Sequence, residues 1–315
     1  MTIPVILDVD TGIDDAWAIW SALRSPVLTV LGITTGYGNA DVDTTTRNTL
    51  LITELAHSDV PVVPGAVKPL WTPWEGPVPD FHGHNGLGDA DLPPVLRKPT
   101  PGDAAQFIRE TVRAHPGQMT LITVARLTNL ARALLYDPEL APLIRQLVVM
   151  GGAAFCPGNV TPVAEANIWG DPEAAQLVLS AGIPTILVGL DVTHQARLTR
   201  DMVERMRRND PASQLFYHAT RFYLDAYRRS SPVFEDWCPI HDALAVFVAE
   251  DPALVQTERY PVAIETTGRL TRGMTVVDSR SGRYPPSPVE VAVGLDGPRF
   301  LNAFLSRSGF FPNPV

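Results

Sequence analysis

The sequence predicts an open, doubly wound α/β fold in which helices cover both faces of a mainly parallel sheet. Two observations support this prediction. Short apolar, β-branched runs recur at residues 3–7, 28–34, 60–63, 119–124, 147–150 and 183–190, and stretches of helical character separate most of them. Strands that are continuously apolar are buried on both faces, and their alternation with helices is typical of a parallel sheet.

The helical segments are identified by their charges and their spacing. Residues 14–23 begin with two carboxylates, which are favourable at a helix N-terminus, and then become apolar. Residues 103–114 and 172–180 show the spacing of amphipathic helices. We therefore expect a helix after the first strand and further helices on the way through the sheet.

One long segment interrupts this alternation. Residues 68–101 are rich in Pro and Gly and carry Trp71, Trp74, Phe81, His82 and His84. Loops of this length inside a compact domain are usually functional and often act as lids. A packed surface loop is an equally good interpretation of the loop length alone.

The C-terminal third differs from the rest of the chain. It is more helical after residue 200, and then shows strand-like runs at residues 260–265, 274–278 and 289–293. These runs predict an antiparallel addition to the sheet. Since no linker-like boundary interrupts the chain, we expect a single domain over residues 1–315.

Composition excludes several classes of function. The net charge is −9, and the basic residues occur singly or in short pairs, without the cationic stripe on which a nucleic-acid polymer binds. No apolar stretch approaches the length of about 20 residues needed to cross a membrane, and the N-terminus lacks the pattern of a signal peptide. The two cysteines form neither a disulfide framework nor a zinc motif. We expect a cytoplasmic protein with a small ligand.

The strongest chemical signal follows the first predicted strand. Asp8, Asp10, Asp14 and Asp15 place four carboxylates within eight residues, at the end of a strand where ligands bind in open parallel sheets. Such carboxylates repel one another unless a cation lies among them, and an all-oxygen set suits calcium or magnesium. Helix capping by the second pair, with the first pair solvated, is the alternative. Four carboxylates together favour the metal.

Other polar residues follow later strands. Asn39 ends the run TTGYGN at 34–39, and Asn159, Glu165 and Asn167 follow the strand predicted at 147–150. His241 and Asp242 begin an apolar helical stretch near the C-terminus. A lone histidine there is more often structural than catalytic, so these two residues belong to the site only if the fold returns them to the aspartates.

Taken together, these motifs resemble the nucleoside hydrolase family, in particular its inosine-uridine preferring type. The resemblance covers nearly the whole chain, and the family fold is an open, doubly wound α/β structure. The runs that carry it are DVDTGIDDA at 8–16, TTGYGN at 34–39, FHGHNGLGD at 81–89, LTNLA at 127–131, VVMGGA at 148–153, VAEANIWGDPEAA at 163–175, GLDVTHQA at 189–196, HD at 241–242 and TGRLTRGMTVVD at 267–278.

The resemblance implies roles for individual residues. Asp10, Asp15, Asp242 and the carbonyl of Val124 would hold a calcium ion, and Asp10 would be the general base. The ribose hydroxyls would be bound by Asp14, Asn39, Asn159, Glu165, Asn167 and Asp242. His241 is the first candidate to protonate the departing base and His82 the second, whereas Asp8 would support the site. Family members are homodimers or homotetramers, so we expect one of these assemblies.

The implied chemistry is consistent with these residue types. Glycoside cleavage passes through an oxocarbenium-like transition state. Calcium would acidify its water and orient the ribose, and an adjacent carboxylate would take the proton. Chelation of both cis-hydroxyls would favour ribose over 2′-deoxyribose. Imidazole, which titrates near neutrality, suits protonation of the leaving base.

The sequence departs from the family pattern at two places. Ala125-Arg126 stands where Gly-Pro usually precedes the LTN motif, which changes the backbone after Val124. Asn85 stands where the lid motif usually has Asp, which removes a charge near the mouth of the site. Neither departure changes a carboxylate ligand.

Two rival functions are compatible with parts of the sequence. Asp8-Val9-Asp10-Thr11 also matches the DxDxT motif of haloacid-dehalogenase-type phosphatases, in which Asp8 would be the nucleophile and magnesium the metal. That chemistry has no role for Asp14, Asp15 or the late His-Asp pair. The other rival is a ribose- or nucleoside-binding protein without turnover, against which the presence of Asp10 and His241 argues.

Overall fold

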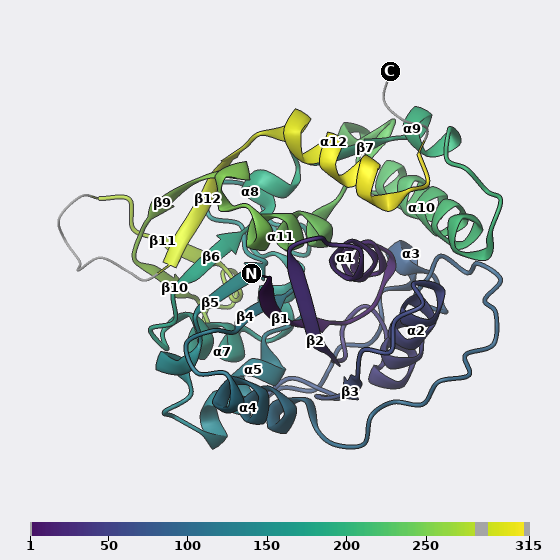
Figure 1. The fold of residues 1–315 in the computed structure, drawn as a ribbon. Helices are drawn as coiled ribbons and strands as arrows, with labels where there is room; N and C mark the ends of the chain where they lie inside the picture. The colour runs from purple at the N-terminus through teal and green to yellow at the C-terminus, as the bar shows by residue number, and fades with distance from the viewer. Residues whose placement is uncertain (1, 281–288, 312–315) are drawn as a thin grey trace.

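The computed structural model describes residues 2–280 and 289–311, and the sheet at its centre has eight strands in this part of the chain (Figure 1). The strand order is β3-β2-β1-β4-β5-β6-β12-β9. Neighbouring strands pair in parallel except β12 and β9, which are antiparallel. The strands are β1 (Ile3–Val9), β2 (Leu28–Thr35), β3 (Val62–Pro64), β4 (Thr120–Thr123), β5 (Gln146–Met150), β6 (Thr185–Val188), β9 (Val255–Arg259) and β12 (Val289–Leu295).

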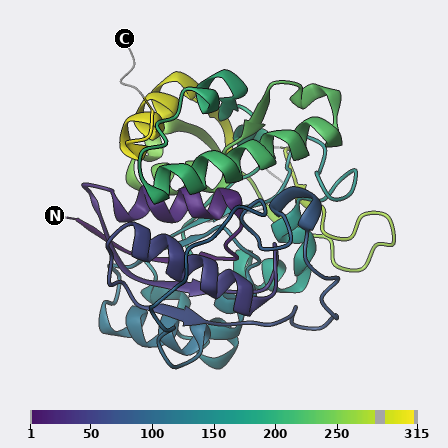
Figure 2. The ribbon, with the colours of Figure 1, turned by 90° about the vertical axis from the view of Figure 1, so that its right-hand side faces the viewer.

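Helices cover both faces of this sheet, and each face has its own hydrophobic core (Figure 1). The helices on one face are α1 (Ile13–Leu23), α2 (Val42–Leu55), α10 (Pro211–Ser230), α11 (His241–Glu250) and α12 (Gly297–Ser308). Those on the other face are α4 (Ala104–Ala114), α5 (Thr128–Tyr136) and α7 (Pro172–Leu179). Figure 2 shows α10 lying alongside α1.

The remaining elements are short. They are α3 (Pro79–His82), α6 (Ala166–Gly170), α8 (Leu190–Thr193), α9 (Arg200–Glu204), β7 (Arg197–Thr199), β8 (Trp237–Pro239), β10 (Val262–Ile264) and β11 (Thr275–Val277), with 3-10 turns at Ala141–Leu143, Pro232–Phe234 and Pro252–Leu254. The pairs β7–β8 and β10–β11 form two small antiparallel sheets.

Strand β1 illustrates how an apolar run supplies both cores. Val5, Leu7 and Val9 pack into the core beneath α1 and α11, whereas Ile6 packs into the core beneath α4 and α5. Successive side chains of a strand point to opposite faces, so a strand between two helical layers must be apolar throughout. Burial of Val5, Ile6 and Leu7 between the two helical layers therefore explains the apolar run of the sequence.

The strand order places a crevice at the end of β1. The chain builds β2 and β3 on one side of β1 and then crosses to β4 on the other side. Gly36 donates to the carbonyl of Val9 at 2.9 Å, and Val124 donates to the carbonyl of Asp8 at 2.9 Å. The segments after β2 and β4 thus leave β1 on its two sides, and ligands bind at such switch points in open α/β sheets.

The predicted fold class is confirmed, and the C-terminal part contributes antiparallel strands as predicted, although their arrangement differs from the expected one. The runs at 260–265 and 274–278 contain β10 and β11 of the separate antiparallel sheet, and the run at 289–293 belongs to β12, which pairs in parallel with β6 and antiparallel with β9. The antiparallel strand of the main sheet is β9, which was not predicted. Its sequence VQTER is largely exposed because it forms the sheet edge, so it lacks an apolar run.

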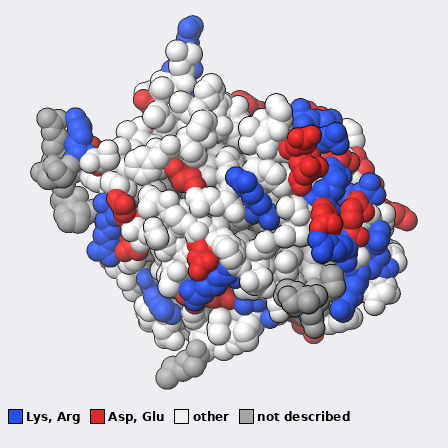
Figure 3. Space-filling model, turned by 90° about the horizontal axis from the view of Figure 1, so that it is seen from above, with Lys and Arg blue, Asp and Glu red and all other residues white. Residues whose placement is uncertain are grey.

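Charged side chains of both signs lie on the surface. Figure 3 shows acidic and basic side chains interleaved on the face seen from above. Within residues 2–280 and 289–311, no helix is both long enough and apolar enough to cross a membrane.

Candidate active site

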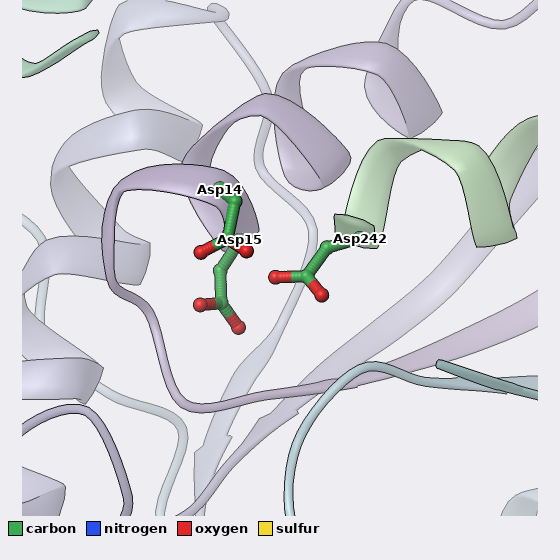
Figure 4. Close-up of side chains that lie close together, drawn as sticks. All are labelled: Asp14, Asp15 and Asp242. Atoms are coloured by element: carbon green, nitrogen blue, oxygen red, sulfur yellow. The ribbon is translucent and has the colours of Figure 1, made fainter. Parts of the chain in front are cut away.

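Carboxylates from the two ends of the chain meet at the crevice beside β1. Asp14 and Asp15 lie in the first turn of α1, and Asp242 lies in the first turn of α11. Helices α1 and α11 pack against each other, so the three side chains converge, each offering an oxygen within 4.8 Å of the others (Figure 4). All three residues are buried. The resemblance implied Asp10, Asp15 and Asp242 as ligands, so this group shares Asp15 and Asp242 with that set and contains Asp14 in place of Asp10.

The turn between β1 and α1 is organised by Asp15. One carboxylate oxygen of Asp15 accepts the backbone N–H of Asp10 at 3.0 Å. The other accepts the N–H of Gly12 and the side-chain amide of Asn39, both at 3.0 Å. These bonds connect the end of β1, the first turn of α1 and the loop after β2, and they hold the backbone of Asp10 beside Asp15.

The Asp10 carboxylate has two different environments. Its Oδ2 accepts the backbone N–H of Asn39 at 2.8 Å and is ion-paired with the Arg126 guanidinium. Its Oδ1 is buried and has no hydrogen-bond partner among the residues that the structure describes. A buried carboxylate oxygen without a partner is unusual and points to a missing ligand.

The electrostatics of the group favour a cation. Burial, together with the adjacent charge of Asp15, raises the pKa of Asp14 to about 7. Burial raises the pKa of Asp242 well above its ordinary value, and Asp14 and Asp15 add to the shift. Burial likewise raises the pKa of Asp10, against the lowering effect of Arg126. Converging oxygens, mutual repulsion and the free Oδ1 fit a hard divalent cation.

A pocket of about 970 Å³ opens over this group. Its volume suits a small molecule. Of the site residues predicted from the sequence, those that line it are Asp14, Asn39, His82, Val124, Asn159, Glu165, Asn167, His241 and Asp242. Asp10 and Asp15 are fully buried and contact the pocket through Asn39. The long loop contributes Trp74, Phe81 and His82, which supports its functional interpretation.

The polar residues after β5 are tightly held. Glu165 caps α6, and its carboxylate accepts N–H groups from Gly152 at 2.9 Å, Asn167 at 2.9 Å and Ile168 at 3.1 Å. The Asn167 amide donates to the carbonyl of Val124 at 2.9 Å, which leaves that oxygen a second lone pair. Asn159 lies exposed at the rim, where its Oδ1 accepts the N–H of Ala166 at 3.0 Å.

Both candidate histidines are buried and neutral. His82 Nδ1 accepts the N–H of Ile13 at 3.1 Å, so its proton lies on Nε2. Burial lowers the pKa of His82 to about 3, and the charge of Arg126 contributes. Burial also lowers the pKa of His241 well below 6.5, with a further effect of His194. The expectation that imidazole titrates near neutrality here is therefore wrong, because the sequence does not reveal the depth of burial.

Sequence reasoning missed two tyrosines. Tyr223 and Tyr227 lie one turn apart on α10, and neither was predicted as a member of the site. The Tyr227 hydroxyl is 2.7 Å from His241 Nε2, and His241 Nδ1 is 2.8 Å from the Thr193 hydroxyl. The Tyr223 hydroxyl lies 3.4 Å from that of Tyr227 and donates to Asp14 at 3.1 Å. Their spacing of four residues was the available signal, because it places both on one helix face.

Arg126 was also missed as a member of the site. The sequence argument treated it as a change of backbone, whereas its buried guanidinium pairs with Asp10 and lines the pocket. Its departure from the family motif was the signal that could have identified it.

Known proteins match this chain over nearly its full length. Uridine nucleosidase 1 of Arabidopsis thaliana is 38% identical over 305 residues, which cover 93% of this chain and 89% of the relative. The pyrimidine-specific ribonucleoside hydrolase RihA of Salmonella arizonae is 39% identical over 316 residues, covering 99% of this chain and 100% of the relative. The solved structure of a purine-preferring ribonucleoside hydrolase from Gardnerella vaginalis has a TM-score of 0.92 and 38% identity, and the match covers 97% of this chain and 98% of that one.

A family model agrees with these relatives. The model described as inosine-uridine preferring nucleoside hydrolase matches residues 5–302, which include the aspartate run of β1 and α1 and the His241-Asp242 pair of α11. The chain therefore belongs to the inosine-uridine preferring nucleoside hydrolase family, and its reaction class is the hydrolysis of ribonucleosides.

Proposed function

We propose that this chain cleaves the N-glycosidic bond of ribonucleosides by means of a calcium ion held by Asp10, Asp15, Asp242 and the Val124 carbonyl. The observation that carries the proposal is the meeting of Asp14, Asp15 and Asp242 beneath a pocket of about 970 Å³. Calcium bound there supplies a water of lowered pKa and a template for a vicinal diol. The remaining chemistry belongs to the side chains of this chain.

Asp10 is the proposed general base. Arg126 and the Asn39 N–H hold its Oδ2, so its carboxylate cannot rotate freely. Its Oδ1 has no partner in the described part of the chain and is available to accept a proton from water. A general base needs this combination of fixed orientation and a free lone pair.

The ribose hydroxyls would be bound by polar groups that line the pocket. These groups are Asp14, Asn39, Asn159, Glu165, Asn167 and Asp242. Most of them are already held by hydrogen bonds, as the Glu165 and Asn167 contacts illustrate, so little ordering is needed when the sugar binds. A substrate that lacks the 2′-hydroxyl would leave buried polar groups unmatched, so we expect strong preference for ribose.

The departing base would take its proton from neutral donors. His241 and the Tyr227 hydroxyl share one hydrogen bond, and the pair can rearrange its protons without a charged imidazole in the resting site. His82 is the second candidate, with its Nε2 proton free of the bond that holds Nδ1. Both histidines line the pocket.

Base preference has to be tested with both classes of nucleoside. A relative described as pyrimidine-specific is 39% identical, and a solved relative described as purine-preferring is 38% identical. These values are too similar to favour either class for this chain. A cytoplasmic location, a homodimer or homotetramer, and a single domain over residues 1–315 stay predictions.

The geometry of Asp8 disfavours the phosphatase alternative. Asp8 Oδ1 accepts the Thr34 hydroxyl at 2.6 Å and the Asn129 amide at 2.8 Å. Asp8 is 2% exposed, and it is not among the residues that line the pocket. A nucleophilic carboxylate needs an oxygen that the substrate can reach, which Asp8 does not offer.

The test is a panel of purine and pyrimidine ribonucleosides, their 2′-deoxy counterparts and a phosphomonoester, each incubated with chelator-treated protein with and without calcium. We expect free base and ribose from ribonucleosides only when calcium is restored. Full activity without metal would refute the calcium proposal. Tight nucleoside binding without release of base would instead favour a binding protein, and phosphate release alone would favour a phosphatase.

A further inference from the structure

Arg126 is a buried cation inside the acidic group, and the proposed reaction leaves it without a role beyond holding Asp10. The residue is 8% exposed. Its Nη1 contacts Asp10 Oδ2 and lies 3.4 Å from Asn167 Oδ1, whereas its Nε is buried without a hydrogen-bond partner in the described residues. Burying a guanidinium is costly unless neighbouring charges compensate it. The neighbouring charges here are the carboxylates of the proposed metal site.

Two glycines make the space that this side chain occupies. A Cβ atom at Gly170, the last residue of α6, would lie 2.6 Å from Arg126 Cγ and 2.7 Å from its Nε. A Cβ at Gly38 would collide with the guanidinium and with Asp10. Neither glycine has a positive φ, so the backbone does not require glycine at these positions. Glycine at position 170 therefore leaves space for the Arg126 side chain, and glycine at position 38 leaves space for both Arg126 and Asp10.

The charges at the site show how Arg126 affects the binding of a metal ion. Four carboxylates, those of Asp10, Asp14, Asp15 and Asp242, would have a combined charge of −4 if all were ionised, and Arg126 reduces it to −3. The guanidinium also occupies a lone pair of Asp10, a proposed ligand. Both effects weaken the binding of a divalent cation, because like charges repel strongly where water is excluded.

We propose that Arg126 is a resident cation that competes with the divalent ion for Asp10 and so sets the metal affinity of the site. The inference rests on the proposed metal ligands. If Arg126 competes with the metal, the affinity of the site for the divalent ion depends on the charge of the side chain at position 126. If Arg126 has only a structural role, the affinity depends on the volume of that side chain.

The experiment is a calorimetric titration of chelator-treated protein with calcium alone. Arg126→Met keeps most of the volume and removes the charge, Arg126→Ala removes both, and Arg126→Lys keeps the charge. We expect Met and Ala to bind calcium about tenfold or more tightly than wild type, and Lys to stay within about threefold of wild type. Unchanged or weaker binding in the Met and Ala variants would overturn the inference.

Gly170→Ala tests the same inference with Arg126 retained. The added methyl group must displace Arg126, so this variant should also bind calcium more tightly than wild type. In the Arg126→Ala background the same change should have no effect, and an equal effect in both backgrounds would contradict the inference. If neither wild type nor Arg126→Met binds calcium, the proposed metal site itself fails. If both bind equally, the role of Arg126 fails alone.

Discussion

The role of a residue in the candidate active site depends on what surrounds each of its atoms, and Asp10 is the clearest example. One of its oxygens is held by Arg126 and the Asn39 N–H, and the other is buried without a partner among the described residues. If Asp10 served only to pair with Arg126, we would expect its second oxygen to accept a hydrogen bond from a neighbouring group. We therefore expect the chemistry to depend on Oδ1.

The Asp10→Asn variant tests this assignment. The amide cannot accept the proton of water, so kcat should fall about 10²- to 10⁴-fold, the usual contribution of a general base. The KM should change little when calcium is saturating, because the ribose contacts are retained. Steady-state rates on a ribonucleoside provide the measurement. A kcat close to that of wild type would remove Asp10 from the role of base.

The leaving-group donors can be tested with a second pair of substitutions. Tyr227→Phe removes the hydroxyl that bonds to His241, and His241→Ala removes the imidazole itself. Both should lower kcat for purine nucleosides about tenfold or more, with a smaller loss for an aryl riboside whose leaving group needs no proton. Tyr217→Phe is the control, because this tyrosine lies on the same helix and its hydroxyl bonds to Glu204. Equal losses on both substrates would exclude the proposed acid role.

At the scale of whole elements, Asp171 connects three parts of the fold. It caps α7 by accepting the N–H of Ala174 at 3.1 Å, and its other oxygen accepts the Leu70 N–H at 2.9 Å and the Thr128 hydroxyl at 2.7 Å. It is fully buried. The long loop after β3 is thus attached to α5 and α7 through a single carboxylate.

Asp171→Ala should therefore cost more than the loss of an ordinary helix cap. It removes a cap worth about 1 kcal/mol and leaves two further buried donors unmatched, so we expect a loss of about 2–4 kcal/mol in the free energy of unfolding. Asp296→Ala is the matched control, since Asp296 caps α12 at the surface and should cost about 1 kcal/mol. Denaturant unfolding measures both values. Similar losses would mean that the Leu70 and Thr128 contacts contribute nothing.

How much the sequence predicts differs between elements for physical reasons. Strands β1 to β6 were predicted because the buried part of each is largely apolar, and Asp10, Asp14 and Asp15 of the proposed site lie in one short segment. Strand β9 was missed because an exposed edge has no such pattern. The ion pair of Arg126 and the low pKa of His241 depend on burial by distant segments, which local sequence does not encode.

At the scale of the whole molecule, folding gathers buried acids in a chain whose net charge is already −9. The pKa of Asp14 rises from 3.8 in the unfolded chain to about 7 in the metal-free fold. Its stabilising contribution is complete below the unfolded pKa and is lost as pH rises through the folded one. The pKa of His82 falls from 6.5 to about 3, so its effect has the opposite sign but operates only below about 6.5.

Above pH 6.5 the buried acids therefore determine how the stability of the fold changes with pH. Chelator-treated protein should lose thermal stability between about pH 6.5 and 8.5. Saturating calcium should raise the Tm and flatten this slope, because a metal ion favours the ionised carboxylates that proton binding would otherwise neutralise. Asp14→Asn removes one titrating group and should reduce the slope of the metal-free protein. Thermal unfolding by circular dichroism at several pH values is the measurement. A Tm that stays constant or rises over this pH range without metal would show that ionisation of the buried carboxylates does not destabilise the fold. It would also show that calcium does not stabilise the protein by neutralising their charge.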